Sequence, residues 1–147
     1  MDTAEEKGYD GGKKVSGIKL HIAVDTLGLP HALHVSRANT TDRDGAVEML
    51  CLNLDSLSSI NKFLVDGGYT GEKFAGRVQE LLPNAEVEVV KRSELHNFKV
   101  LPKRWIVERS FGWLEKYRRL WKNCERKLHT SLEMTVLAFI SILINRF

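Results

Sequence analysis

The residues KFLVDGG, at positions 62–68, form a short apolar run that two glycines bring to an end. Such a run is typical of a strand that is buried on both faces of an α/β sheet. Asp66 is the last residue of the run, and the carboxyl ends of sheet strands are where α/β folds collect ligands. Asp66 is therefore a candidate site residue, although an aspartate here also serves to end the strand and cap the turn.

Strand and helix patterns alternate on both sides of this run and predict a single α/β domain with a mixed sheet flanked by helices. The polar residues 1–13, which include three glycines, are expected to form a flexible N-terminal arm. The strands are expected over residues 14–24, 29–36, 62–66 and 86–90. The helices are expected over about 43–52, 70–82, 101–127 and 131–146, the last with Ser131 as its cap.

The composition indicates a soluble, cytoplasmic protein. The chain has 147 residues, of which 43% are hydrophobic, so it is long enough for one globular domain. Its two cysteines cannot form a disulfide framework, and its polar N-terminus is no secretory signal. The longest apolar run, residues 136–144, is shorter than the roughly 20 residues of a membrane-spanning helix, so no membrane partner is expected.

Positive charge is concentrated in residues 91–129, which hold 12 Lys and Arg against 4 Asp and Glu. The net charge of this segment is +8, whereas that of the whole chain is +3. Such an asymmetry favours a surface that binds a polyanion, most often nucleic acid. The alternative is a solvated helix face without such a partner.

The helix expected over residues 101–127 places an acid among these basic residues. Helical spacing aligns Arg104, Glu108, Gly112 and Glu115 along one stripe, and the tryptophans at 105, 113 and 121 are expected to pack in the core. Glu108 could share a divalent metal with Asp66, and carboxylate oxygens suit Mg²⁺ or Mn²⁺. The alternative is that Glu108 only pairs with Arg104 on a solvated face.

Four stretches of the chain resemble, in order, the DDE transposases of bacterial insertion sequences, in the insertion-sequence-four/five group. They are GYDGGKKVSGIKLHIAVDTLGLP (8–30), ANTTDRDGA (38–46), FLVDGGYTG (63–71) and KRWIVERSFGWLEKYRRL (103–120). The resemblance implies a ribonuclease-H-like mixed sheet flanked by helices, with an acidic triad that binds two Mg²⁺ or Mn²⁺ ions. Asp66 matches the second acid of the triad and Glu108 the third.

The first acid of the family lies on a strand upstream of the GYDGG stretch, and Asp2, Asp10 and Asp25 do not match it in position. The resemblance therefore implies that residues 1–147 form a single partial catalytic domain that lacks the first strand. It implies metal-dependent DNA strand cleavage and strand transfer, with transposase activity only when an upstream segment completes the site. The alternative is a non-catalytic DNA-binding fragment that modulates an intact transposase. A third reading is an interaction protein with no DNA role.

DNA, as transposon ends and target, is the partner that the resemblance implies, together with an upstream transposase segment or an intact transposase. A homo-oligomer in the bacterial cytoplasm, associated with the nucleoid, is also expected. Basic residues of two segments are the expected phosphate contacts. They are Lys13, Lys14, Arg104, Arg109, Lys116, Arg118 and Arg119.

Overall fold

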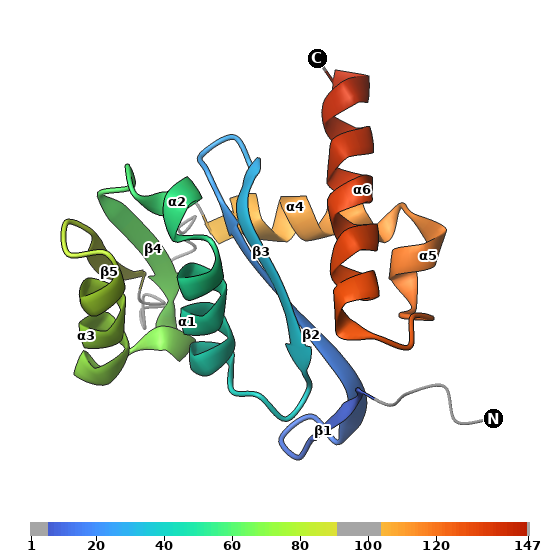
Figure 1. Ribbon diagram of the computed structural model, residues 1–147, viewed down its shortest axis with the longest axis horizontal. Helices are drawn as coiled ribbons and strands as arrows, with labels where there is room; N and C mark the ends of the chain where they lie inside the picture. The colour runs from blue at the N-terminus through green and yellow to red at the C-terminus, as the bar shows by residue number, and fades with distance from the viewer. Residues whose placement is uncertain (1–5, 91–103, 147) are drawn as a thin grey trace, which may run out of the picture.

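The computed structural model describes residues 6–90 and 104–146, which form five strands and seven helical segments (Figure 1). The strands are β1 (Gly8–Asp10), β2 (Val15–Val24), β3 (Pro30–Arg37), β4 (Lys62–Asp66) and β5 (Glu86–Val90). The helical segments are α1 (Asp42–Leu52), α2 (Leu54–Leu57), the 3₁₀ turn η1 (Gly67–Tyr69), α3 (Glu72–Leu81), α4 (Arg104–Glu115), α5 (Arg118–Trp121) and α6 (Leu128–Arg146). The α/β class is confirmed.

The strands of the described residues form two sheets instead of one. An antiparallel sheet has the order β1–β2–β3, and β4 pairs with β5 in parallel. In the β2–β3 hairpin, Ile18 lies opposite Arg37 and the turn contains Gly28 with a φ of 85°, which favours glycine. The expected mixed sheet is therefore divided, because no strand of the described residues joins β2 to β4.

The N-terminal segment is more ordered than expected. Gly8–Asp10 is a strand rather than part of a flexible arm, and it pairs with the first residues of β2. The carboxylate of Asp10 accepts hydrogen bonds from the backbone N–H groups of Gly12 and Lys13, which closes the tight turn between the two strands. Residues 1–5 of the predicted arm lie outside the described residues.

The long helix predicted over 101–127 is wrong as a single element. Residues 101–103 lie outside the described part of the chain, and the rest is α4 followed by the short α5. Between these helices Tyr117 has an extended backbone, with φ −87° and ψ 109°. Its side chain packs against the core beside α6, and its hydroxyl donates to Ser141 Oγ at 3.0 Å. This tertiary contact accompanies the break between α4 and α5. Helical periodicity in the sequence does not reveal such a break.

The last helix begins at Leu128, so Ser131 is not its cap. The backbone N–H of Leu128 donates instead to the carboxylate of Glu6, at 2.6 Å. A side chain from the N-terminal segment therefore serves as the acceptor that a local cap would otherwise supply. Ser131 is buried one turn inside the helix, and its hydroxyl donates to Asn123 Oδ1.

Two hydrophobic cores lie on opposite faces of the β2–β3 hairpin. The first joins α1, α2, α3 and the β4–β5 pair to Ala32 of β3, and Leu57 and Val78 are its most buried residues. The second joins α4 and α6 to Leu20 and Leu33. Because neighbouring strand residues point to opposite faces, Ala32 and Leu33 belong to different cores. Figure 1 shows α1 and α3 on one side of the hairpin and α6 on the other.

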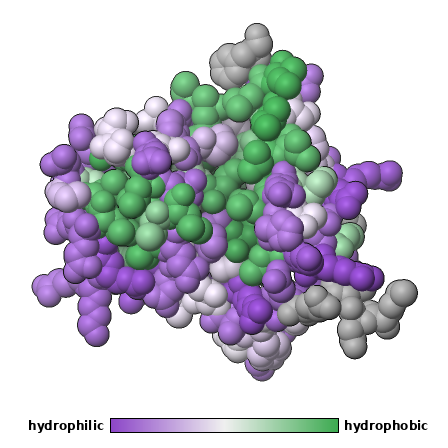
Figure 2. Space-filling view, in the orientation of Figure 1, coloured by the Kyte–Doolittle hydropathy of each residue, from purple (hydrophilic) through white to green (hydrophobic). Residues whose placement is uncertain are grey.

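Among the described residues, α6 alone is long and apolar enough to cross a membrane, by length and composition. Its side chains at Ala138, Phe139 and Ile142 are buried in the second core. Apolar side chains also remain exposed along the helix, as Figure 2 shows. They are Val136, Leu137, Ile140 and Ile144.

Candidate active site

One cleft of about 830 Å³ brings the two predicted acids to a common surface. Residues of β2 and β4 line its sides, and α1 and α4 contribute further walls. Asp66 lies at the end of β4 and Glu108 lies on α4; both side chains are exposed and both line this cleft. The geometry therefore makes the cleft the candidate active site.

The orientation of Asp66 follows from the turn after its strand. Its Oδ1 accepts a hydrogen bond from the backbone N–H of Gly68, at 2.8 Å, so the carboxylate caps η1. Arg43 of α1 donates from Nε to the carbonyl of Gly68, at 3.0 Å. The capping role considered from the sequence is present, and it leaves the carboxylate exposed at the cleft.

Tyr69 is the last residue of η1; it is half-buried and lines the cleft. Burial, together with the negative charges of Asp42 and Asp66, raises the pKa of Tyr69 to about 12. Its ring packs against Phe74 with the centroids 5.2 Å apart. The phenol is therefore protonated at neutral pH and adds no charge to the cleft.

The element that carries Glu108 is fixed to the tip of the β2–β3 hairpin. The hydroxyl of Ser110, which has no exposed surface, donates to the carbonyl of Gly28 at 2.8 Å. Arg109 Nη2 donates to the carbonyl of Leu27 at 2.6 Å. The Arg109 guanidinium carbon lies 4.7 Å from the centre of the Trp105 ring and 5.0 Å from that of Trp113.

Two further acids line the cleft, and neither was proposed as a site residue. Asp25 is the first residue of the turn between β2 and β3. Burial opposes its ionisation, but hydrogen bonds from the backbone N–H groups of Leu29 and Leu27 and from His31 lower its pKa. Asp42, at the start of α1, lies 3.0 Å from the Nζ of Lys19.

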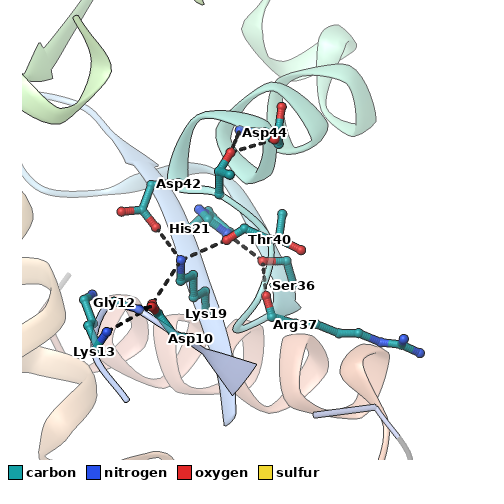
Figure 3. Close-up of polar contacts among 11 residues, drawn as sticks. Asp10, Gly12, Lys13, Lys19, His21, Ser36, Arg37, Thr40, Asp42 and Asp44 are labelled. Atoms are coloured by element: carbon teal, nitrogen blue, oxygen red, sulfur yellow. Dashed lines mark hydrogen bonds and ion pairs between the residues drawn. The ribbon is translucent and has the colours of Figure 1, made fainter. Parts of the chain in front are cut away.

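A polar cluster around Lys19 joins β1, β2 and α1 beside the cleft (Figure 3). Lys19 Nζ donates to the carbonyl of Thr40 at 2.8 Å and forms ion pairs with Asp42 and Asp10. Burial opposes the charge on Lys19, but its two acidic neighbours raise its pKa above the usual value. The strand alternation that places Lys19 and His21 on one face was the available signal for this cluster.

The carboxylates of Asp66 and Glu108 have the donor atoms that a divalent metal requires, and they could form part of a metal site. Carboxylate oxygens are the ligands that Mg²⁺ and Mn²⁺ prefer. No group of three or more His, Cys, Asp or Glu side chains within residues 6–90 and 104–146 lies close enough together to hold a metal ion. Asp66 and Glu108 thus offer suitable donors without forming a three-acid site.

Five of the predicted phosphate contacts lie in two exposed areas of the protein, whereas Arg109 is half-buried. Lys13 and Lys14 lie in the β1–β2 turn, and Lys116, Arg118 and Arg119 lie at and before α5; all five are exposed. Arg119 pairs with Glu125 at 2.6 Å. Arg109 instead faces the hairpin tip and two tryptophan rings. The side chain of Arg104 lies outside the described residues.

The tryptophans differ in their surroundings. Trp113 is buried in the second core, as predicted. Trp105 is 49% exposed, so its predicted core position is wrong. Arg109 covers one face of the Trp105 ring, and the rest of the side chain is partly open to solvent. The side chain of Trp121 is outside the described part of the chain.

Comparison with known proteins places the chain in a family. The family described as the transposase DDE domain matches residues 1–143. The chain is 29% identical over 122 residues to a protein of Burkholderia cepacia described as a putative transposase for insertion sequence element IS402. The match covers 76% of this chain and 55% of that relative. No solved structure matches. The chain belongs to the family of DDE-domain transposases.

Proposed function

We propose that this chain is the C-terminal part of a transposase catalytic domain that cleaves DNA and joins DNA strands in a metal-dependent reaction. The observation that carries the proposal is that Asp66 and Glu108 line one cleft in a chain of the transposase family. The fold that we assign to the complete domain is ribonuclease-H-like. The chain spans about half the length of the curated relative, and we propose that it is inactive until an upstream segment supplies a first acid.

Asp66 and Glu108 would hold the divalent metal of this reaction. When bound, Mg²⁺ or Mn²⁺, two ions in a complete site, supplies activation of the attacking hydroxyl and neutralises charge on the scissile phosphate. In cleavage, water attacks the phosphorus and the bond to the 3′ oxygen breaks. In strand transfer, that 3′-hydroxyl attacks a phosphate of the target DNA, the phosphorus–3′-oxygen bond of the target strand breaks, and the target's own 3′-hydroxyl is released. Exposed Asp66 is held toward the cleft by Gly68, whose carbonyl is fixed by Arg43.

The exposed basic residues would hold the DNA by its phosphates. Lysine and arginine contacts to phosphates fix the position of a duplex without reading its sequence. We assign this role to Lys13, Lys14, Lys116, Arg118 and Arg119, and also to Arg104 from its place in the sequence. Arg109 contacts the hairpin tip, so we assign it a place in the fold beside Glu108. We further propose that the protein acts in the bacterial cytoplasm, at the nucleoid, as a homo-oligomer.

The catalytic proposal is tested in an intact transposase that contains this chain. Asp66→Asn and Glu108→Gln are each expected to lower Mg²⁺-dependent cleavage of transposon-end DNA by about a thousandfold, roughly 4 kcal/mol of activation free energy. The matched controls are Asp55→Asn and Glu133→Gln, which remove exposed acids that do not line the cleft. Strand joining that survives either cleft substitution would reject the proposal.

A second candidate function is that the chain binds DNA without cutting it and modulates an intact transposase. The exposed basic residues around α5, together with Lys13 and Lys14, favour this alternative because they need no acid to bind phosphate. Duplex affinity of the isolated chain should fall steeply as salt rises from about 50 to 200 mM. Replacing Lys116 and Arg118 with alanine should lower the slope of log affinity against log salt by about 2, while Lys73→Ala on α3 should not.

The two functions are separated by adding the isolated chain to an intact transposase. Inhibition of the intact enzyme by this chain, together with full activity of an Asp66→Asn enzyme, would favour the binding function. Loss of activity in the Asp66→Asn enzyme favours the catalytic one. If the Asp66→Asn enzyme keeps its activity and the isolated chain also shows no salt-dependent DNA affinity, only an interaction protein without a DNA role is left.

A further inference from the structure

The last helix, α6, has an apolar face that stays open in the described part of the chain. Four of its apolar side chains are exposed: Val136 by 38%, Leu137 by 56%, Ile140 by 46% and Ile144 by 73%. Residues three and four apart lie side by side on a helix surface, so these side chains form one apolar row, the α6 stripe. Figure 2 shows apolar surface along this helix. The opposite side of α6 packs in the second core, so the described residues use only one of its two apolar sides.

The size of the α6 stripe suits the packing of one helix against another. Residues 136–144 rise by about 12 Å along the helix axis, which is a little more than two turns. A row of this length can pack into the groove between the side-chain rows of a second helix. The open patch is on the order of a few hundred Å², whereas a stable complex buries about 800 Å² on each partner. An association through this patch alone is therefore reversible and weak, in the micromolar range or above.

The spacing of the stripe favours a second copy of the chain as its partner. Val136 and Ile144 each lie four residues from Ile140, on either side of it. In a twofold-symmetric pair the same surface of both copies is in contact. An antiparallel pair centred on Ile140 therefore places Val136 of one copy against Ile144 of the other, and every apolar residue of the row meets an apolar residue. Rows of side chains four apart form the commonest class of helix contact, and Leu137 lies beside this row.

The charge on the same face selects the antiparallel direction. Glu133 is exposed and lies one turn before the stripe, on the same side of the helix. A parallel pair would bring the Glu133 carboxylates of the two copies together and would align the two helix dipoles, and both effects are unfavourable. An antiparallel pair opposes the dipoles and leaves each Glu133 at the solvent-exposed rim, beyond the apolar residues of the other copy.

We propose that the α6 stripe is the surface through which two copies of this chain pair, with their α6 helices antiparallel and Ile140 at the twofold axis. No residue of α6 lines the cleft, so both copies keep Asp66 and Glu108 open to DNA. The inference rests on the proposed function only for the homo-oligomer, whose contact surface it names. The pairing itself requires neither metal nor DNA.

Cysteine cross-linking of the whole chain tests the pair and its register. The exposed Cys51 and Cys124 are first replaced by serine. A disulfide forms only where two Cα atoms come within about 7 Å, so Ile140→Cys should link two copies about tenfold faster than Val136→Cys or Ile144→Cys alone. A mixture of the Val136→Cys and Ile144→Cys chains should link as fast as Ile140→Cys, because these positions meet only between copies. Fast linking of Val136→Cys to itself would indicate a parallel pair and overturn the proposal.

Sedimentation of the unmodified chain measures the association itself. Its average mass should rise between about 10 and 500 μM, and Leu137→Glu should weaken the association about tenfold, because it brings a charge into the contact. Leu137 is 56% exposed, so this variant should keep its fold, which circular dichroism checks. The matched control is His129→Glu, which places the same charge on an exposed position of α6 before the stripe. A chain that stays monomeric throughout, or equal association of the two variants, would overturn the proposal.

The other candidate for covering the stripe is the remainder of a longer transposase polypeptide. The same Ile140→Cys substitution in an intact transposase separates the two, because two copies should again be linked there if the stripe is the contact. An intact enzyme whose Ile140→Cys chains stay unlinked would show that its own polypeptide covers the stripe, and would overturn the proposal.

Failure of these tests is distinguishable from failure of the proposed function. Cross-linking and sedimentation are measured without metal or DNA, so a protein that neither cuts nor binds DNA can still form the pair. Conversely, an active transposase whose Ile140→Cys chains stay unlinked would retain the function and lose this inference.

Discussion

His21 shows how much a single buried residue depends on its neighbours. Its ring is 7% exposed, its Nε2 lies 2.9 Å from Ser36 Oγ, and it stacks on His34 at 5.9 Å. It packs directly against α1 at Gly45, where any added Cβ would collide with the ring. Burial, followed by the nearby charge of His34, lowers the pKa of His21. The folded protein therefore favours the neutral ring.

This lowered pKa makes stability depend on pH. The unfolded chain takes up the proton at the ordinary value of 6.5, whereas the folded chain resists it. The stabilisation is therefore complete above pH 6.5 and is lost as the pH falls through the lower folded-state pKa. Urea unfolding at about pH 7.5 and 5.5 should show this loss, and His21→Gln should reduce it. The exposed His129→Gln is the control; an unchanged pH dependence in His21→Gln would contradict the assignment.

Local sequence patterns located some site residues and missed others for a physical reason. Asp66 was singled out because it stands at the end of an apolar strand beside two glycines, which is a local signal, whereas Asp25 and Asp42 of the same cleft were not proposed as site residues. The ion pairs of Lys19 with Asp10 and Asp42 were missed, because they depend on how β1 and α1 pack around β2 (Figure 3). Alternation within β2 predicts on which face Lys19 lies, but it does not identify acidic partners that are 9 and 23 residues away in the chain.

Among the elements, α4 is held by polar contacts in addition to the packing of Trp113 and Leu114 in the second core. Arg109 spans from the helix to the carbonyl of Leu27, and Ser110 reaches the carbonyl of Gly28. The Trp113 ring has Arg109 near it at 5.0 Å and Arg146 of α6 at 3.8 Å. The hairpin tip and the end of α6 are therefore both tied to the helix that bears Glu108.

Arg109→Ala should lower the free energy of unfolding by about 2 kcal/mol, because it removes a charged hydrogen bond and two cation–π contacts. Arg109→Lys should recover part of the loss, since lysine keeps the charge but lacks the planar guanidinium. Urea unfolding followed by tryptophan near-ultraviolet circular dichroism measures both. Arg118→Ala, an exposed arginine of α5, should change stability by less than about 0.5 kcal/mol. Equal stability of the Arg109→Ala and Arg118→Ala proteins would rule this role out.

Elements with strong local patterns were predicted well, and those shaped by distant contacts were not. Both β4 and β5 have the predicted bounds, because local patterns define them: β4 is a short apolar run ended by two glycines, and β5 is a run of alternating glutamate and valine that follows Pro83. The break at Tyr117 accompanies packing against α6, and the start of α6 uses Glu6. Helical periodicity continues through both places and carries no sign of either contact.

At the scale of the whole molecule, the β2–β3 hairpin connects two halves that are otherwise distinct. It contributes Ala32 to the core beneath α1 and α3, and Leu33 to the core beneath α4 and α6. The open edges of β2 and β4 face the cleft, so no sheet hydrogen bonds between these strands hold the halves together in the described residues. The unfolding of one half is therefore coupled to that of the other largely through the side chains of the hairpin.

Two large-to-small substitutions test this arrangement. Leu57→Ala in the first core and Phe139→Ala in the second remove side chains that are 0% and 2% exposed, and each should cost about 3 kcal/mol. Because, among the described residues, the two cores share only the hairpin strands, Leu57→Ala should speed amide exchange mainly in α1, α3, β4 and β5, and Phe139→Ala mainly in α4 and α6. If either substitution speeds exchange equally in all these elements, the two halves unfold as one unit. The hairpin would then couple them as strongly as a continuous sheet does.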